Sequence, residues 1–499
     1  MKELGDPNRI PVIIAVGECC DRPEVPTEGF DSIELMLAAL KAAEADAGMA
    51  LLSRLDWLGV EDQISYPTPT PQDDLAEKLP ARPSTVVKTA DASGDGPLRL
   101  INDAANLIGE GRVRLAAAVG AEALRTAAKQ AQADIAAGRE PPRNNIAEVA
   151  KANAKPLAKR HGLYTPIDVY PLYENATRAA WGQSVAEGQR ESAQIWSQFS
   201  KVAAANPMAW IQREIPPETI AEPTTDNRML AFPYTKLMVA NSSVNMGAAV
   251  IVGSLAMARE LGIDEDRLVY IGAGAAAHED DDFLLRDSYE HSASLETTIT
   301  AALDRNGLTV GDIDTVELYS CFPCVPKMAR RVLGWPADRP ASVYGGLTFG
   351  GGPIGNCMMH AAARMVHGLR KEGTNGLIVA NGGYATHSHS IVLTRTPQPA
   401  GTFPQDYDAQ SEADARRGPV PRLLEDYEGD GTIETYTIPY GRDGMPDRAT
   451  VIARTPDGDR FLATVPNGDR ETLEFLTGDG VVGSKGQAKR IGDTIVWTR

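Results

Sequence analysis

Short, continuously apolar runs alternate with longer amphipathic stretches over most of the chain. Residues 10–17 are apolar and end in glycine, a pattern typical of a strand buried on both faces. The amphipathic stretch 31–48, which Asp31 and Ser32 can cap, is predicted to be the helix that follows. Further strands are predicted near 83–89, 112–120, 267–272, 313–319 and 376–381, and further helices at 97–111, 292–306, 324–334 and 355–371. This rhythm predicts a parallel sheet with helices on its faces.

The rhythm stops between residues 125 and 235, which are rich in Arg, Asn, Gln, Trp and Pro. Helical stretches are predicted there at about 145–160, 173–182 and 190–205. The β/α pattern resumes at 236–262, where an apolar run leads into a helix ending near Gly262. We therefore predict two similar α/β halves, at 1–124 and 236–400, separated by an inserted loop domain at 125–235.

The pattern of apolar and polar residues changes again after residue 400. Residues 401–421 hold Pro, Asp and Gly with little periodicity, as a linker would. Short alternating segments separated by turns follow within 422–499, at 432–439, 449–454, 460–465 and 493–498. Such a series predicts a separate, small antiparallel β-barrel of the OB type.

Composition narrows the class of protein. The 499 residues are 43% hydrophobic, which is enough for ordinary globular cores. A net charge of −18 argues against a broad nucleic-acid or anionic-membrane surface. No stretch approaches the roughly 20 apolar residues that span a bilayer, so a soluble, cytoplasmic protein is expected. The 5 cysteines are too few and too unevenly placed for a disulfide framework, so free thiols are expected.

Candidate chemistry is most concentrated in residues 319–360. A reactive-type pair, Tyr319 and Cys321, comes directly after a predicted strand. A glycine-rich run at 345–355 follows, and it leads into the helix that carries His360. Glycines let the backbone approach a ligand closely, and a helix start exposes N–H groups, so this stretch is predicted to be half of an active site.

Four segments together resemble the thiolase superfamily, in particular thiolase-like proteins of the acetyl-CoA acetyltransferase branch that carry an added C-terminal domain. The Tyr-Ser-Cys-Phe segment is similar to the sterol-carrier-type His-Asp-Cys-Phe motif. The resemblance covers essentially the whole chain and implies two βαβαβαββ halves with a loop domain between them. The four segments are Asn241-Ser242-Ser243 with Gly247-Ala248-Ala249, Tyr319-Ser320-Cys321-Phe322, Gly351-Gly352-Pro353-Ile354-Gly355 and Asn381-Gly382-Gly383.

The departures from the family pattern concern its covalent machinery. Counting back from Ile108 and Gly111 places Gly94 where thiolases have their nucleophilic cysteine, whereas matching Asp91 to Cys-Ala-Ser-Gly places Asp91 there. No cysteine lies between residues 20 and 321, so neither register supplies a thiol. Gly352 stands in place of the activating histidine and Asn381 in place of the second-half cysteine. A covalent acyl-enzyme of the thiolase kind is therefore not expected.

The resemblance also implies roles for the residues that remain. Tyr319 and Cys321 are the acid/base candidates, because a thiol with a pKa of about 8.5 exchanges protons near neutrality and a phenol can donate to an oxyanion. Tyr344 is a candidate partner phenol and His360 a further catalytic candidate, although each is also consistent with a packing role. The thioester is expected to be held by Gly94, Gly352, Asn381 and Gly383.

Metal and redox sites are weaker alternatives. Cys321 and Cys324 form a C-x-x-C pair without a second pair of ligands, so structural zinc is not expected. His387 and His389 would share one face of a strand, and the acidic run 279–282 is better explained as a solvated loop. We therefore expect no metal and no covalently bound cofactor, with coenzyme A present only as part of the substrate.

Three functions remain open at this point. The first is an acyl-CoA enzyme, formally an acyltransferase, that makes or breaks a carbon–carbon bond. The second is a retro-aldolase (lyase) acting on a 3-hydroxyacyl-CoA, because related aldolases of this fold lack the nucleophile and use tyrosines. The third is a non-catalytic CoA-binding scaffold. In each case the expected partner is an acyl-CoA, and the resemblance implies a homodimer or a dimer of dimers.

Overall fold

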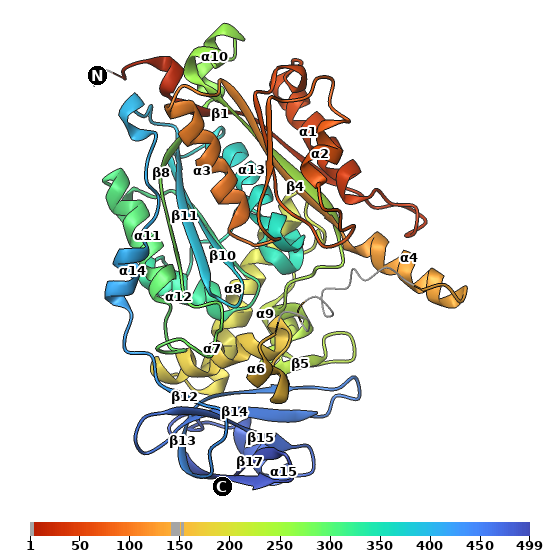
Figure 1. The fold of residues 1–499 in the computed structure, drawn as a ribbon, viewed down its shortest axis with the longest axis vertical. Coiled ribbons are helices and arrows are strands. Elements are labelled where there is room, and N and C mark those ends of the chain that lie inside the picture. Colours follow the sequence, from red (N-terminus) through yellow and green to blue (C-terminus); the bar gives the residue numbers. More distant parts are fainter. Residues whose placement is uncertain (1–3, 141–149, 151–153) are drawn as a thin grey trace.

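A large α/β body stands on a small barrel, with a helical insertion between them (Figure 1). The structure, a computed structural model, describes residues 4–140, 150 and 154–499. One sheet of nine strands runs through the body. Its strands, in sheet order, are β3 (Thr85–Lys88), β2 (Trp57–Val60), β4 (Leu115–Ala123), β7 (Asn245–Ser254), β1 (Pro11–Cys20), β8 (Val269–His278), β11 (His387–Thr394), β10 (Asn375–Gly382) and β9 (Thr315–Leu318).

The strand order shows that the body is duplicated. Strands β1 and β8 are antiparallel neighbours at the centre of the sheet. Outward from β8 come β11, β10 and β9, and outward from β1 come β7, β4 and β2, with the same sequence of pairings on each side. The two similar halves expected from the sequence are therefore present. The run after residue 236 holds β7, however, which pairs with β4 and β1 of the first half.

The prediction of a parallel sheet is wrong for one strand in each half. β7 is antiparallel to both β4 and β1, and β11 is antiparallel to both β10 and β8. In the second half the reason is local: only residues 383–386 connect β10 to β11, and so short a connection can join only antiparallel neighbours. In the first half, the whole insertion lies between β4 and β7.

Helices cover both faces of the sheet because the strands are apolar on both faces. In β1, Val12 and Ile14 belong to one buried cluster, whereas Ile13 and Val16 belong to the other. A capping box at Asp31 begins α1 (Ser32–Ala47) on the face of the first cluster. On the other face, α3 (Gly96–Gly109) and α13 (Cys357–Leu369) contact each other between the halves. The remaining helices of the body are α2 (Pro71–Ala76), α10 (Leu255–Glu260), α11 (Ala293–Asn306), α12 (Cys324–Leu333) and α14 (Gln410–Arg416).

The insertion between β4 and β7 is mainly helical. Its elements are α4 (Leu124–Ala136), α6 (Pro156–Arg160), α7 (Pro166–Ala180), α8 (Val185–Ala205), α9 (Pro217–Ala221), β5 (Met229–Phe232) and β6 (Tyr234–Thr235). Half of the helix predicted at about 145–160 lies outside the described residues, and α6 forms its end. The predicted linker 401–421 packs on the body, since the N–H of Ala276 donates to the carbonyl of Tyr407.

The C-terminal barrel closes through five strands. They are β13 (Gly429–Pro439), β14 (Arg448–Arg454), β15 (Arg460–Pro466), β16 (Lys485–Ile491) and β17 (Thr494–Thr498), with α15 (Arg470–Leu476) between β15 and β16. The closed order is β13-β14-β15-β17-β16-β13, as in an OB fold. Its pairs are antiparallel except that β15 and β17 are parallel. The short β12 (Leu423–Leu424) and β5 extend this sheet.

Candidate active site

A cavity of about 600 Å³ lies where the two halves meet the insertion. It brings together five of the residues expected from the sequence: Gly94, Tyr319, Cys321, Gly352 and Gly383. None of the described residues that line it is charged. Such a wall suits the uncharged, partly apolar end of a ligand rather than an ion.

Gly94, at the turn into α3, faces Tyr319 directly. A Cβ atom at residue 94 would lie 2.6 Å from the ring of Tyr319, 2.7 Å from its hydroxyl and 2.2 Å from the carbonyl oxygen of Asn381. The phenol thus fills the space in which a side chain at 94 would stand. The side chain of Asp91, the other candidate for this position, is exposed to solvent.

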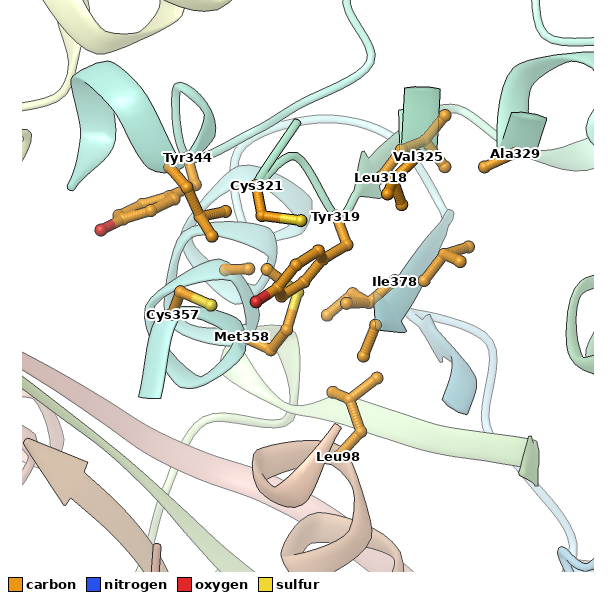
Figure 2. Close-up of a cluster of buried hydrophobic side chains, with 14 of the residues drawn as sticks. Leu98, Leu318, Tyr319, Cys321, Val325, Ala329, Tyr344, Cys357, Met358 and Ile378 are labelled. Carbon is orange, nitrogen blue, oxygen red and sulfur yellow. The ribbon is translucent and has the colours of Figure 1, made fainter. Parts of the chain in front are cut away.

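Tyr319 and Cys321 follow β9 and are protonated at neutral pH. Burial, reinforced by the nearby thiols, raises the pKa of Tyr319 well above its usual value, and burial raises the pKa of Cys321 to about 12. Figure 2 shows the Tyr319 hydroxyl directed toward the sulfur of Cys357. Both side chains can donate a proton or a hydrogen bond, but neither is a base near neutrality. The expectation that Cys321 exchanges protons near pH 7 does not fit its burial.

Tyr170 is a cavity residue that the sequence did not single out. It lies on α7 of the insertion, and its ring stacks on Phe322 at 4.5 Å between centroids. Its hydroxyl donates to the carbonyl of Gly383 at 3.0 Å and accepts from the Asn381 side-chain amide at 3.1 Å. It also accepts from the N–H of Ala385 at 3.2 Å. Tyr170 therefore fixes the loop after β10 that forms one wall of the cavity.

The glycine-rich run at 345–355 serves packing more than ligand binding. Within it lies the π-helical turn η6 (Gly346–Gly350). A Cβ at Gly345 would lie 2.6 Å from that of Ala203 on α8, and one at Gly346 would lie 2.6 Å from the ring of Phe199. The N–H groups of Gly345 and Gly346 already donate to the Ser342 hydroxyl. The glycines thus let α8 approach closely.

The hydrogen bonds decide which expected thioester donors are available. The N–H of Gly352 is taken, because it donates to the carbonyl of Asn241 at 2.9 Å. The Asn381 amide is directed at Tyr170 rather than at the cavity. Within the described part of the chain, the N–H groups of Gly94 and Gly383 have no acceptor. These two amides are therefore the ones that can meet a thioester oxygen.

The structure does not bring Tyr344 and His360 to the cavity. The Tyr344 hydroxyl donates to the carbonyl of Gly351 at 2.8 Å, and its ring stacks on His360 at 5.6 Å. Figure 2 shows Tyr344 pointing away from Tyr319. His360 lies 2.9 Å from the carboxylate of Glu18, which also pairs with Arg364. Both residues hold the Gly-rich loop and α13 in place.

The floor of the cavity on the first-half side rests on Glu61, which directly follows β2. Its Oε1 accepts from the N–H of Ser93 at 2.9 Å, and the side chain is fully buried. A Cβ at Gly96 or at Gly355 would lie within 2.5 Å of its carboxyl oxygens. Burial raises the pKa of Glu61 well above its usual value, so burial favours the neutral form of this carboxyl group. Sequence analysis missed both β2 and this residue.

Among the residues that the structure describes, no cluster of His, Cys, Asp and Glu side chains could hold an ion. Cys321 and Cys324 are both buried and free. His389 is buried beside Asn102, and burial lowers its pKa to about 3.

The described helices include none that is both long and apolar enough to cross a bilayer.

Solved thiolase structures share the fold of this chain. The human mitochondrial 3-ketoacyl-CoA thiolase, solved in complex with CoA, aligns over 78% of this chain and 98% of its own, with a TM-score of 0.57 at 15% identity. A curated relative, a probable acetyl-CoA acetyltransferase of Mycolicibacterium smegmatis, is 26% identical over 232 residues. That alignment covers 44% of this chain and 57% of the relative, so the chain spans little more than half of it.

A closer likeness extends over the full length. A crystal structure described as a monomeric SCP2-thiolase-like protein type 1 from Mycobacterium smegmatis is 30% identical and covers 99% of both chains, with a TM-score of 0.82. Residues 408–493 match the family model of the thiolase-like protein type 1 additional C-terminal domain. The chain therefore belongs to the SCP2-thiolase-like protein type 1 family, and its C-terminal barrel is the additional domain of that family.

Proposed function

We propose that this chain acts on a carbon–carbon bond of a CoA thioester, formally in the acyltransferase class, without a cysteine nucleophile. The observation that carries the proposal is the pair Gly94 and Tyr319. A phenol fills the space beside the start of α3, and that space has no room for a side chain at 94. The name of the curated relative, an acetyl-CoA acetyltransferase, supports the substrate class.

The cavity groups suit an enolate mechanism. Breaking or making a bond next to a thioester places negative charge on the thioester oxygen, which neutral donors and backbone amides stabilise. Tyr319 and Cys321 are such donors, and the free N–H groups of Gly94 and Gly383 line the same space. Coenzyme A enters as part of the substrate, and the chemistry needs no bound cofactor.

A second candidate is retro-aldol cleavage of a 3-hydroxyacyl-CoA. It is favoured by the protonation of Tyr319 and Cys321, because that reaction needs proton donors beside the thioester and no acyl-enzyme. Cleavage would give a carbonyl compound and a shortened acyl-CoA.

The test is a panel of CoA thioesters offered to the purified full chain. Acetoacetyl-CoA with CoA reports thiolysis, and a set of 3-hydroxyacyl-CoA thioesters reports release of an aldehyde or ketone. Intact-protein mass spectrometry on acid-quenched samples then looks for an acyl adduct. We expect turnover with unmodified protein. A thioester-linked acyl-enzyme would overturn the proposal, and tight binding without any turnover would make the chain a CoA-binding scaffold.

Assembly is tested separately. The full-length relative is described as a monomer, whereas the wider thiolase resemblance predicts a homodimer for this chain. Sedimentation of the purified chain with and without acyl-CoA distinguishes the two.

A further inference from the structure

A hydroxyl–carboxylate pair lies at the cavity wall between Gly94 and β10. Ser93 lines the cavity, and its hydroxyl donates a hydrogen bond to Oδ1 of Asp95. A Cβ at Gly382 would lie 2.2 Å from the Ser93 oxygen and 2.5 Å from that carboxylate oxygen. Glycine at 382 therefore lets β10 pass directly against this pair.

Asp95 precedes α3 but does not cap it, since its side chain accepts no hydrogen bond from the helix N–H groups. Its second oxygen pairs with Arg99 at 3.3 Å instead, and the residue is only 4% exposed. The other groups that face it are His387 and His389 on β11 and the neutral Glu61 behind it. The carboxylate therefore interacts with the side chains of Ser93 and Arg99 and does not cap the helix.

The charge of Asp95 distinguishes it from its neighbours at the cavity. Burial opposes ionisation, but the hydrogen bond from Ser93 and the charges of His387 and Arg99 outweigh it, so the pKa of Asp95 lies below its usual value. Burial raises the pKa values of Tyr319, Cys321 and Glu61 and so favours their neutral forms. Groups whose environments push their pKa values apart are the usual mark of an acid and a base.

We propose that Ser93 is a catalytic residue that takes the α-proton of the bound acyl thioester while its own hydroxyl proton passes to Asp95. Asp95 acts through Ser93 and is a positioning and proton-holding residue. This inference rests on the proposed action on CoA thioesters and names a base, which the other described residues that line the cavity do not supply.

The step is balanced within the site. The Cα–H bond breaks, and its electron pair becomes the thioester enolate, with the negative charge on the thioester oxygen near Tyr319 and the free amides. The proton goes to the Ser93 oxygen, whose O–H bond breaks as Asp95 becomes a neutral acid. The reverse transfer returns a proton to Cα, as cleavage of a carbon–carbon bond requires. No oxidant, reductant or other reactant takes part.

The experiment follows exchange of the α-hydrogens of acetyl-CoA for deuterium in D₂O, with the full chain and by NMR. Binding of acetyl-CoA is measured beside it by calorimetry. We expect the wild-type chain to accelerate exchange above the buffer rate. The Ser93→Ala and Asp95→Asn variants should each lose about a hundredfold or more in exchange rate, as for loss of a general base, while the Kd changes little.

Two variants separate chemistry from folding. Ser93→Thr keeps the hydroxyl and should retain exchange within about tenfold of wild type, because the proton relay survives. Thr309→Ala removes a surface hydroxyl–carboxylate pair of the same kind, with Asp312 at 2.7 Å, and should leave the rate unchanged. Circular dichroism of each variant reports the fold.

The pH dependence of the exchange rate distinguishes a base linked to Asp95 from a thiolate or hydroxide. A carboxylate base with a pKa below its usual value is fully ionised from pH 5 to 8, so exchange should be flat over that range. A tenfold rise per pH unit would instead assign the base to the Cys321 thiolate or to hydroxide and overturn the inference.

The remaining outcomes each decide a different claim. Exchange that survives in Ser93→Ala, or binding of acetyl-CoA without exchange by the wild type, would also overturn the inference. Failure of the wild type to bind any acyl-CoA would instead overturn the proposed function on which the inference rests.

Discussion

The first residue after the second strand of each half occupies an equivalent place in the duplicated sheet, yet the two residues differ in kind. After β2 it is Glu61, whose N–H donates to the carbonyl of Val119 on β4 at 2.8 Å. After β9 it is Tyr319, whose N–H donates to the carbonyl of Val379 on β10 at 3.0 Å. The backbone thus delivers both side chains to the centre of the molecule in the same way.

The difference lies in what faces each side chain. Glu61 meets Gly96 and Gly355 under the floor and is sealed from the cavity, so it is a neutral acid that holds Ser93. Tyr319 meets Gly94 and lies at the cavity surface. The duplicated frame fixes the position, whereas the glycines opposite decide whether the side chain supports the site or meets the ligand.

Removing the Tyr319 hydroxyl is expected to have the largest effect. Tyr319→Phe keeps the ring against Gly94 but loses the donor to the enolate, so kcat should fall by about 10²–10⁴-fold with little change in stability. Steady-state kinetics on the best thioester of the panel measures it. Tyr427→Phe, which loses a barrel phenol bonded to the carbonyl of Asp430, is the matched control. Full activity in Tyr319→Phe would remove Tyr319 from the chemistry.

The second largest effect is expected when a side chain is placed at residue 94, opposite Tyr319. In Gly94→Cys the new Cβ must displace the Tyr319 ring and the Asn381 carbonyl, so the free energy of unfolding should fall by about 1–3 kcal/mol. The thiol should not restore thiolase chemistry. In a double-mutant cycle measured by urea unfolding, Gly94→Cys should cost less in a Tyr319→Ala background than in the wild type, because the ring no longer occupies the space. A fully stable Gly94→Cys protein that forms an acyl-enzyme would refute this packing account.

The neutral state of Glu61 predicts a smaller, pH-dependent effect. A carboxyl whose pKa is raised on folding contributes stability below its unfolded pKa of about 4.3 and loses it as pH rises through the folded pKa. Glu61→Gln has no proton to lose, so its advantage over wild type should grow with pH, by up to about 1.4 kcal/mol per pH unit. Urea unfolding at pH 5 and pH 7 measures it. A difference that does not change with pH would mean that Glu61 is ionised in the fold.

Removing the support that Tyr170 gives to the cavity wall should affect stability and ligand binding more than turnover. Tyr170→Phe leaves the Asn381 amide and the Ala385 N–H without their shared acceptor and should cost about 1–3 kcal/mol of stability. KM should rise more than kcat falls if the loop after β10 only positions the ligand. An unchanged KM would show that the wall holds without this hydroxyl.

Long apolar runs and capping signals made the frame predictable from sequence. The predicted helix at 31–48 matches α1, and the runs at 10–17 and 112–120 match β1 and β4. Tyr170 was missed because the helix was expected to begin at 173. The signal was nevertheless present, since Thr165 and Asp168 form a capping box around Pro166 at the true start.

The chemistry was harder to predict because it depends on burial and on contacts distant in sequence. A free-solution pKa made Cys321 look like a base, whereas desolvation makes its thiol a weak acid. Glu61 and Gly355 are far apart in the chain and meet only after the halves fold together. Neither fact has a local sequence signal.

A crystal structure with an unreactive thioether analogue of acetyl-CoA tests the central claim most directly. The account predicts the acyl oxygen, or its stand-in, within about 3.2 Å of the Tyr319 hydroxyl or the Gly94 and Gly383 amides. It also predicts the α-carbon within about 3.5 Å of the Ser93 oxygen and no sulfur of the protein near the acyl carbon. An acyl group seated against the sulfur of Cys321 and away from Tyr319 and Ser93 would contradict it.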